Sequence, residues 1–553
     1  MDKYTIGLDY GTLSLRGVLF NILNGDQVAV SVYEYPHKVM ETSLPSGVKL
    51  GDSWALQDPR DYVDGMEYVI KELMKSSQVD KESVIGIGVD FTSCTILPTL
   101  KDGRPLCELE EFKDEPHSYV KLWKHHAAQY CANKLNTIAE ERQETWLKLY
   151  GGKISSEWLF PKVMQIVEEA PEIYDAAERI IEAGDWLVWT LTGEETRSAC
   201  QAGYKAMYHH EFGYPSKEFL KALNPRLEHI VEEKLDAPII SVGRKAGGLT
   251  EEMASRIGLL KGTAIASAVI DAHASVPACE IDSEGKMLMI MGTSTCHMLL
   301  SNTEEGVEGS CGIVKDGILP GTYGYEAGQS CVGDMFAWFV ENCVSQEYYN
   351  NAKNENMNIH DYLTQKANTL RPGESGLLAL DWWNGVRSDL MDFDLSGMIL
   401  GMTLMTKPEE LYRALIEGTG FGTKQIINCF EDANIKVREL YAAGGIAEKN
   451  PMAMQIYADV CNLPIRISAS GQSGALGSAI YAIGAAGEDI SGYKSVNEAA
   501  KKLGRLKDVI YTPIEENVQV YGKLFAEYVR LHDYFGKGEN NVMKTLKKLK
   551  RMS

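Results

Sequence analysis

The chain has 553 residues, 44% of them apolar and 24% charged, a balance typical of a folded globular protein with more than one core. Its formal net charge of −22 argues against a general nucleic-acid binder, because such a protein needs a basic face to neutralise phosphates. The eleven cysteines show no CxxC spacing, and no apolar run reaches the roughly 18 residues of a membrane-spanning helix. We therefore expect a cytoplasmic protein with neither a disulfide framework nor a zinc site, and with no nucleic-acid or membrane partner.

The first predicted element is a β-hairpin over residues 4–20, YTIGLDYGTLSLRGVLF. One apolar strand enters the pair Gly11–Thr12 and a second apolar strand leaves it. Glycine lets backbone N–H groups approach an anion, and the hydroxyls of Thr12 and Ser14 add donors, so this tip is suited to hold phosphate. Asp9, just before the tip, is a hard oxygen ligand able to orient Mg²⁺ or its water shell.

The rest of the first half alternates helical and strand patterns. Asp58 and Pro59 announce a helix with one apolar face, and a nearly continuous apolar strand follows at Val84–Phe91. That strand ends in the polar run TSCT, as expected of an interior strand whose end borders a site. Residues 121–197 are helical in pattern and carry five of the nine tryptophans, most of which we expect in the core.

The second half begins near Gly262 with an apolar run that ends at Asp271, in the segment AVIDAHAS. A buried carboxylate is costly unless it is paired or functional. Phosphoryl transfer needs positioning, charge neutralisation and a group that accepts the alcohol's proton, and one carboxylate can do the last. Asp271 is therefore the candidate general base, while a helix N-cap role remains the alternative.

A second Gly-Thr hairpin follows at residues 286–300, KMLMIMGTSTCHMLL, with the tip GTS at 292–294. Its glycine and hydroxyls offer the same kind of phosphate donors as the first tip. The position that Asp9 occupies in the first copy is Ile290 here, so one copy would bring the metal and the other only phosphate donors. The copies lie about half a chain length apart, which predicts two similar domains facing one nucleotide.

Two capping-box patterns mark helices in the last part of the chain. Thr406 with Glu409 opens a predicted helix over residues 411–430, and Ser495 with Glu498 opens another. The basic cluster at the end, KTLKKLKRMS at residues 544–553, is interpreted as a solvated helix end, with a membrane or RNA contact as the alternative.

Between these helices a strand leads into Gly444 and Gly445 and then into a helix with Asn450 as its N-cap. The glycine pair makes a flat backbone surface on which an adenine could lie, although such a pair is often only a turn. A small-residue helix at residues 470–487 could pack closely beside it, and close helix packing is the alternative to a binding role.

The sequence contains no G-x-x-x-x-G-K-[ST] motif and no protein-kinase signature, so the phosphates must be held in another way. Taken together, the motifs resemble those of the FGGY carbohydrate kinases over nearly the whole chain. The ordered segments that carry the resemblance are GLDYGT, VDFTSC (89–94), LWKHHAA (122–128), SSEW (155–158), AGDW (183–186), IDAH (270–273), MGTST (291–295), LDWWNGVRS (380–388), GGIAEKNPMAMQIYADV and SGQSGALGSAI.

The resemblance implies an α/β protein of two actin-like, ribonuclease-H-like domains with a catalytic cleft between them. We place the domains at residues 1–265 and 266–553. ATP is the implied co-substrate and Mg²⁺ the implied metal, held by Asp9, with Asp271 as catalytic base. The sugar site would be lined by Ser93, Lys205, Asp271 and Glu326, the phosphates by Gly11, Thr12, Ser14, Arg16, Gly292, Thr293 and Ser294, and the adenosine by Gly444, Gly445 and Asn450.

The segments are most similar to family members that act on L-ribulose, which implies ATP-dependent phosphorylation of its terminal hydroxyl to L-ribulose 5-phosphate in arabinose breakdown. A kinase for D-ribulose, xylulose or a pentitol is the alternative within the family. A non-kinase actin-like ATPase switch is the alternative from another class, and Asp271, Lys205 and Glu326 argue against it because a switch needs no sugar pocket. The oligomeric state stays open, and a homodimer is compatible with the sequence.

One segment departs from the family pattern. PKVMQIV, at residues 161–167, keeps the lysine of the first family signature but has Gln165 where a tryptophan is usual. The departure touches none of the expected site residues.

Overall fold

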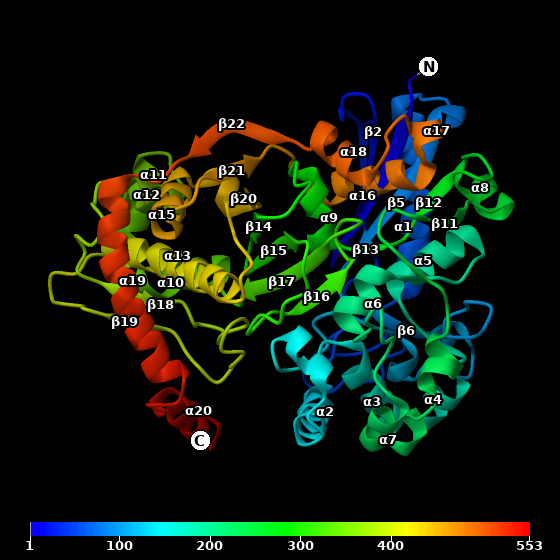
Figure 1. Ribbon diagram of the computed structural model, residues 1–553, viewed down its shortest axis with the longest axis horizontal. Coiled ribbons are helices and arrows are strands. Elements are labelled where there is room, and N and C mark those ends of the chain that lie inside the picture. Colours follow the sequence, from blue (N-terminus) through cyan, green and yellow to red (C-terminus); the bar gives the residue numbers. More distant parts are fainter. Residues whose placement is uncertain (1, 553) are drawn as a thin grey trace.

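The structure is a computed structural model that describes residues 2–552, with side chains described from residue 2 to residue 550. Two similar mixed sheets, one from each half of the chain, form its centre (Figure 1). The first has the strand order β11–β12–β5–β1–β2–β3, with β13 also paired to β5. Its strands are β1 (Tyr4–Tyr10), β2 (Ser14–Asn21), β3 (Gln27–Glu34), β5 (Val84–Phe91), β11 (Lys245–Gly248), β12 (Ala264–Ala266) and β13 (Val269–Ile270).

The second sheet has the order β16–β17–β15–β14–β20–β21–β22. In both sheets a hairpin and a third antiparallel strand lie on one side, and two parallel strands lie on the other. This shared topology confirms the predicted pair of similar α/β domains. The strands are β14 (Lys286–Met291), β15 (Thr295–Ser301), β16 (Gly312–Lys315), β17 (Tyr323–Gln329), β20 (Glu439–Ala443), β21 (Ile465–Ser468) and β22 (Leu506–Tyr511).

Residues between β5 and β11 build a further region with the small sheet β4–β7–β6–β8, seen at the lower right of Figure 1. Most of the five tryptophans of this region were expected in the core, and three of them are buried. Trp123 is 37% exposed, and Trp146 is partly buried. The elements of this region are β6 (Ile96–Thr99), β7 (Val120–Lys121), β8 (Arg179–Glu182), α2 (Gln129–Glu141), α3 (Leu159–Glu169), α4 (Pro171–Ala176), α5 (Ala183–Thr192), α6 (Ala199–Lys205) and α7 (Lys217–Leu223), with β4 (Leu56–Gln57) preceding them.

Helices cover the two faces of the first sheet. Helix α1 (Pro59–Ser77) begins where predicted, because Asp58 accepts the N–H of Arg60 as N-cap and Pro59 occupies the first turn. Its apolar face is buried against β2 and β3. The opposite face of the sheet is covered by α16 (Ser473–Ala486), a helix from the far end of the chain.

Helix α16 approaches the first sheet and helix α9 (Asp271–Ala278) so closely that only glycine fits at several contacts. A Cβ on Gly7 of β1 would lie 1.8 Å from the carbonyl oxygen of Ala475, and one on Gly477 would lie 1.6 Å from that of Ala274 in α9. The small-residue helix therefore serves close packing, with contacts to the first sheet and α9. The proposed domain boundary at residue 265 lies inside β12.

Helix α13 (Pro408–Asp432) corrects the predicted capping box. The N-cap is Lys407, whose backbone N–H donates to the Glu410 carboxylate at 2.7 Å, while the Thr406 hydroxyl accepts the N–H of Thr403. The pattern was shifted by one residue because proline favours the first helical position and so fixes the residue before it as N-cap. The predicted N-cap of α18 (Val496–Leu503) is confirmed, because the Ser495 hydroxyl accepts the N–H of Glu498. The reciprocal half of the box differs, since the Glu498 carboxylate accepts the N–H of Lys494 and not that of Ser495.

The basic tail forms α20 (Val542–Met552) at the end of the chain (Figure 1). Lys544 pairs with Asp392 at 2.5 Å, and Lys547 donates to the carbonyl oxygens of Phe393 and Leu395. The tail is thus docked on the 392–395 segment, whereas a frayed solvated end was expected; its last residue, Ser553, lies outside the described residues. Among residues 2–552, no helix combines the length and the apolar character needed to cross a membrane.

The other helices of the second half surround its sheet, and α19 runs along one side of the molecule (Figure 1). They are α10 (Gly333–Cys343), α11 (Gln346–Asn354), α12 (Ile359–Ala367), α14 (Gly445–Lys449), α15 (Pro451–Cys461) and α19 (Glu515–Gly536), and the short strands β18 (Leu378–Leu380) and β19 (Met398–Leu400) pair with each other. Helices α8 (Glu251–Ile257) and α17 (Glu488–Ser491) lie with the first sheet instead, where α8 contacts α1 and α17 contacts α16 (Figure 1).

Candidate active site

The first Gly-Thr tip joins β1 to β2 as predicted. The N–H of Gly11 donates to the carbonyl oxygen of Ser14 at 3.0 Å, which closes the turn. Two side chains from the neighbouring region hold Thr12: Gln57 Nε2 donates to its carbonyl oxygen at 2.7 Å, and Trp123 Nε1 donates to its hydroxyl at 3.1 Å. The exposed ring of Trp123 therefore belongs to the surroundings of the tip and not to the core.

The second tip joins β14 to β15. The N–H of Gly292 donates to the carbonyl oxygen of Ser294 at 2.9 Å, and Gly292 and Thr293 are exposed. The start of α10 packs against the tip, because the N–H groups of Val332 and Gly333 donate to the carbonyl oxygens of Thr293 and Gly292. Both predicted tips are therefore tight turns with accessible hydroxyls at the ends of equivalent strands.

The segment predicted to line the adenosine lies against the second tip. Gly444 has φ of 94°, and a Cβ there would lie 2.5 Å from the carbonyl oxygen of Met291, so the position requires glycine. A Cβ on Gly445 would meet open space. Asn450 is the N-cap of α15, since its side chain accepts the N–H of Ala453 at 3.0 Å.

Two carboxyl groups lie side by side near the C-terminal ends of two central strands of the first sheet. Asp9 on β1 is in register with Arg16 on β2 and with Asp90 on the parallel strand β5. Asp90 is fully buried and accepts the Ser478 hydroxyl of α16 at 2.6 Å. The equivalent position in the second sheet is Ile290, so the second copy has no such pair.

Burial dominates the electrostatics of this pair. It raises the pKa of Asp9, which its contact with Asp90 and the charge of Arg16 lower only in part. Burial and the nearby charge of Asp9 raise the pKa of Asp90 well above its usual value. Two buried carboxyl oxygens with so little positive charge beside them are the hard donors that a divalent cation prefers, so the residues fit a Mg²⁺ site.

Asp271 is the first residue of α9, directly after β13. Its Oδ1 accepts the N–H of Ala272 at 2.7 Å, and no described residue donates a hydrogen bond to Oδ2. The N-cap position is Ile270, so the alternative role of Asp271 as N-cap is not what the structure shows. Desolvation by the surrounding protein raises the pKa of Asp271 to about 7, with a further rise from Asp9.

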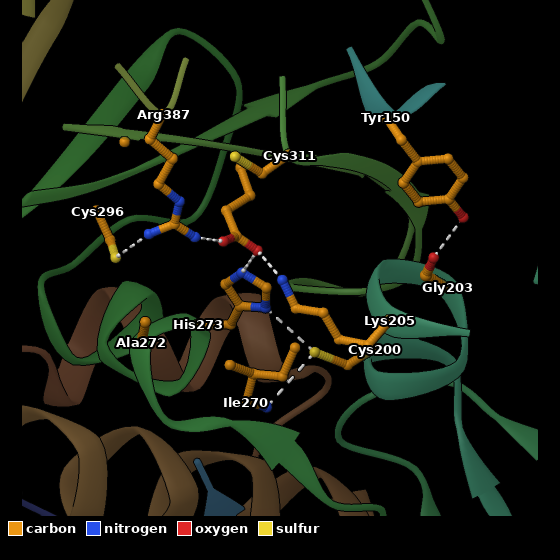
Figure 2. Close-up of polar contacts among 12 residues, drawn as sticks. Tyr150, Cys200, Gly203, Lys205, Ile270, Ala272, His273, Cys296, Cys311 and Arg387 are labelled. Atoms are coloured by element: carbon orange, nitrogen blue, oxygen red, sulfur yellow. Dashed lines mark hydrogen bonds and ion pairs between the residues drawn. The ribbon is translucent and has the colours of Figure 1, made fainter. Parts of the chain in front are cut away.

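The buried carboxylate of Glu326 on β17 is surrounded by three basic side chains. Figure 2 shows Lys205, His273 and Arg387 converging on one carboxylate. Lys205 Nζ donates to Glu326 Oε2 at 2.9 Å, Arg387 Nη2 donates to Oε1 at 2.6 Å, and His273 Nε2 lies 3.3 Å from Oε2. Lys205 comes from the first half of the chain and Glu326 from the second, so this group spans both.

The basic neighbours keep Glu326 ionised. Burial alone would raise its pKa, but Lys205, His273 and Arg387 together hold the pKa of Glu326 well below its ordinary value. Burial alone would lower the pKa of Lys205, but the charge of Glu326 raises it. The ring of Trp158 lies 5.5 Å from Lys205 Nζ, so this tryptophan walls the group while it is itself buried.

Ser93 lies on the loop that follows β5, as the polar end of that strand predicted. The next residue, Cys94, has φ of 56°, and its carbonyl oxygen accepts Lys162 Nζ at 2.5 Å. Lys162 also donates to the carbonyl oxygen of Leu122 at 2.8 Å, so this buried lysine holds two loops together. Gln165, which departs from the family pattern, is buried three residues later in the same helix.

The structure brings four of the predicted site residues, all with ionisable side chains, into two neighbouring groups. One group contains Asp9, Asp90 and Asp271, and the other contains Lys205 and Glu326. Asp9 from the first group and both members of the second affect the pKa of Asp271. Sequence reasoning missed Asp90, Arg387 and Lys162 as contributors. Asp90 could have been found from its place at the end of a buried strand, whereas the contact between Arg387 and Glu326 joins residues far apart in sequence and left no local signal.

The model of the FGGY family of carbohydrate kinases, N-terminal domain, matches residues 4–277, and that of the C-terminal domain matches residues 287–486. The chain is 58% identical to a ribulokinase of Bacillus licheniformis over 98% of both chains. It is 55% identical to a ribulokinase of Halalkalibacterium halodurans over 99% of this chain and 98% of the relative.

Solved structures of sugar kinases share the fold at low sequence identity. A xylulose kinase from Rhodospirillum rubrum superposes with a TM-score of 0.79 at 20% identity, covering 96% of this chain and 98% of the other. A gluconate kinase from Lactobacillus acidophilus gives 0.78 at 19% identity, covering 97% and 99%. With both domain models matched and the duplicated sheets in place, the chain belongs to the FGGY family of carbohydrate kinases.

Proposed function

We propose that this carbohydrate kinase, which uses ATP as its co-substrate, is a ribulokinase. It would transfer the terminal phosphoryl group of ATP to the terminal hydroxyl of L-ribulose, giving L-ribulose 5-phosphate for arabinose breakdown. The observation that carries the substrate is the identity of more than half of all residues to curated ribulokinases over nearly the full length of both chains. The Lys205–Glu326 group supports it, because a sugar kinase needs buried donors and acceptors for hydroxyls.

In this proposal Asp271 is the general base. The sugar's hydroxyl oxygen forms a bond to the γ-phosphorus as the bond to the ADP oxygen breaks, and the hydroxyl proton moves to Asp271 Oδ2. A pKa of about 7 suits the task, since the carboxylate is substantially ionised at neutral pH yet more basic than an ordinary aspartate. Its free Oδ2 leaves an oxygen for the proton.

Lys205, Glu326 and Ser93 would bind the sugar. Lys205 can donate to sugar oxygens with the protons that Glu326 does not use, and Glu326 can accept from hydroxyls through its remaining lone pairs. Ser93 adds a hydroxyl on the loop that Lys162 fixes. The buried positions of Lys205 and Glu326 strengthen these contacts because little water competes for them.

The phosphates would lie between the two tips, with Gly11, Thr12, Ser14, Arg16, Gly292, Thr293 and Ser294 as donors. Gly444, Gly445 and Asn450 would line the adenosine, where the open space above Gly445 leaves room for a planar base. Asp9 would hold Mg²⁺, with Asp90 beside it. When bound, the ion supplies positive charge for the β- and γ-phosphate oxygens.

Three further assignments complete the proposal. The domain boundary is proposed at residues 265/266, within β12 and before β14, the first strand of the second sheet. A cytoplasmic location is supported by the eleven cysteines, all of which are free thiols in the structure. A homodimer is proposed as the assembly, to be tested by sedimentation.

The proposal is tested by coupled ADP release over L-ribulose, D-ribulose, xylulose and several pentitols. We expect the highest kcat/KM with L-ribulose and little ADP release without sugar. A higher kcat/KM for another pentulose or a pentitol would contradict the proposal that L-ribulose is the substrate. Equal ADP release with and without every sugar would contradict the kinase and favour an ATPase switch.

A further inference from the structure

Cys200 contacts the chain on both sides of Asp271. Its Sγ accepts the N–H of Ile270 at 3.5 Å and lies 3.2 Å from Nδ1 of His273, as the dashed lines of Figure 2 show. Cys200 lies on α6, the helix that ends with Lys205. One buried thiol therefore joins the strand–helix junction that carries Asp271 to the helix that carries the buried lysine.

The tautomer of His273 follows from its neighbours. Burial lowers the pKa of His273, so the ring is neutral and carries one N–H. Nε2 lies 3.3 Å from the carboxylate of Glu326, which would repel a nitrogen lone pair, so we assign the proton to Nε2. Nδ1 is then an acceptor, and the Cys200 thiol donates to it. Burial raises the pKa of Cys200, which keeps the thiol protonated for this role.

These contacts form one chain, from the backbone of Ile270 through Cys200 and His273 to Glu326. Ile270 is the residue before Asp271, and His273 is two residues after it, so the contacts hold the chain on both sides of Asp271. They end at the carboxylate of Glu326, which pairs with Lys205. We propose that Cys200 and His273 are positioning residues that fix Asp271 relative to Glu326 and hence relative to the bound sugar. This inference rests on the proposed role of Asp271 as general base.

Cys200→Ala removes both contacts to the Asp271 junction. Displacement of a reacting group by about 1 Å can cost about 100-fold in rate, so we expect kcat to fall by about 10- to 100-fold with ATP-analogue affinity unchanged. Cys200→Ser retains a donor and an acceptor at the same position and should restore most of the loss. The matched control is Cys131→Ala, which removes an equally buried thiol from α2, away from the site, and should leave kcat unchanged.

Two substitutions of His273 separate its two contacts. In His273→Asn the amide reaches the level of Nδ1 and can keep Cys200, but it no longer reaches Glu326. In His273→Gln the amide reaches the level of Nε2 and can keep the contact with Glu326. We therefore expect KM for the sugar to rise about tenfold in His273→Asn and much less in His273→Gln. The double variant Cys200→Ala with His273→Gln should lose less kcat than the product of the two single losses, because each single substitution already breaks the contact between Cys200 and Nδ1 of His273.

The experiment measures kcat, sugar KM, ATP-analogue affinity and unfolding temperature for this set. Wild-type kcat in Cys200→Ala, or equal KM in the two His273 variants, would overturn the inference. Should Cys200→Ala fail to fold, Cys200→Ser and the two His273 variants decide by the same KM comparison. If the wild-type enzyme does not act on L-ribulose, the proposed substrate fails, and the set is measured with the sugar that does support ADP release.

Discussion

Asp9 on β1 lies in register with Asp90 on β5, and the two carboxyl groups affect each other's pKa. The folded-state pKa of Asp90 is raised, so the folded protein binds more protons than the unfolded chain and loses stability as the pH rises above about 4. The two carboxylates near the ends of β1 and β5 thus lower the stability of the folded protein when they are charged, and a bound cation would relieve this loss.

Asp90→Asn removes one of these charges while its side-chain oxygen can still accept the Ser478 hydroxyl. We expect the free energy of unfolding to rise by about 1 kcal/mol or more at pH 8, with a smaller gain at pH 5, because the raised pKa of Asp90 leaves more of the carboxyl group protonated at pH 5 than at pH 8. Thermal unfolding at the two pH values measures this. The exposed Asp489→Asn is the control for net charge. A lower unfolding temperature at pH 8 would show that the Asp90 charge is stabilising.

Glu326→Gln leaves Lys205 and Arg387 without their shared counter-charge. Removing one partner of a buried ion pair typically costs about 3 kcal/mol of stability, and the two cations here share the one carboxylate. We expect a loss of that size in urea unfolding, together with a higher sugar KM. An unchanged unfolding midpoint would mean that water or another group already compensates the cations.

The rate of the reaction should depend on the ionisation of Asp271. With a pKa of about 7, the carboxyl group is protonated and inactive as a base at lower pH, so kcat/KM for the sugar should fall below pH 7. The measurement is a pH profile at saturating ATP, with enzyme stability checked at each pH. A profile that stays flat down to pH 5 would assign proton acceptance to another group.

Two glycine substitutions in helices should have opposite effects. Alanine is favoured over glycine in a helix interior by about 1 kcal/mol, so Gly522→Ala in α19, where a Cβ meets open space, should stabilise the protein. Gly477→Ala in α16 would place its Cβ 1.6 Å from a backbone oxygen of α9 and should destabilise by about 2 kcal/mol or more. Chemical denaturation compares the two. Stabilisation by both would show that α16 can move away from α9.

Gly445→Ala probes the proposed adenosine surface. The added methyl group meets no protein atom within 4 Å, so the stability of the free protein should change little. On the proposed surface it would instead meet the base, and we expect ATP-analogue affinity to fall about tenfold. Titration calorimetry gives the affinity. Unchanged affinity would place the adenosine elsewhere.

The parts of the fold that the sequence predicted are those set by local patterns. The two hairpins follow from apolar strands around Gly-Thr turns, and α1 follows from Asp58 and Pro59. The start of α13 was predicted one residue too early because the capping pattern was given more weight than Pro408.

The candidate site was predictable only residue by residue. Lys205 and Glu326 came from matched motifs, but their direct pairing depends on how the two halves of the chain pack. Arg387, which completes the pair, lies in a loop between β18 and β19, within the matched segment at residues 380–388, but nothing in that segment indicates its contact with Glu326. Long-range contacts of this kind depend on the packing of the whole fold.

The most direct test of the central claim compares sugar phosphate formation by the wild-type enzyme and Asp271→Asn, with L-ribulose and ATP as substrates. The product is identified by mass and by the position of its phosphate. We predict that the wild type forms L-ribulose 5-phosphate and that Asp271→Asn binds ATP analogue normally but loses about 100-fold or more in kcat. An Asp271→Asn variant with wild-type kcat would contradict the assignment of Asp271 as general base.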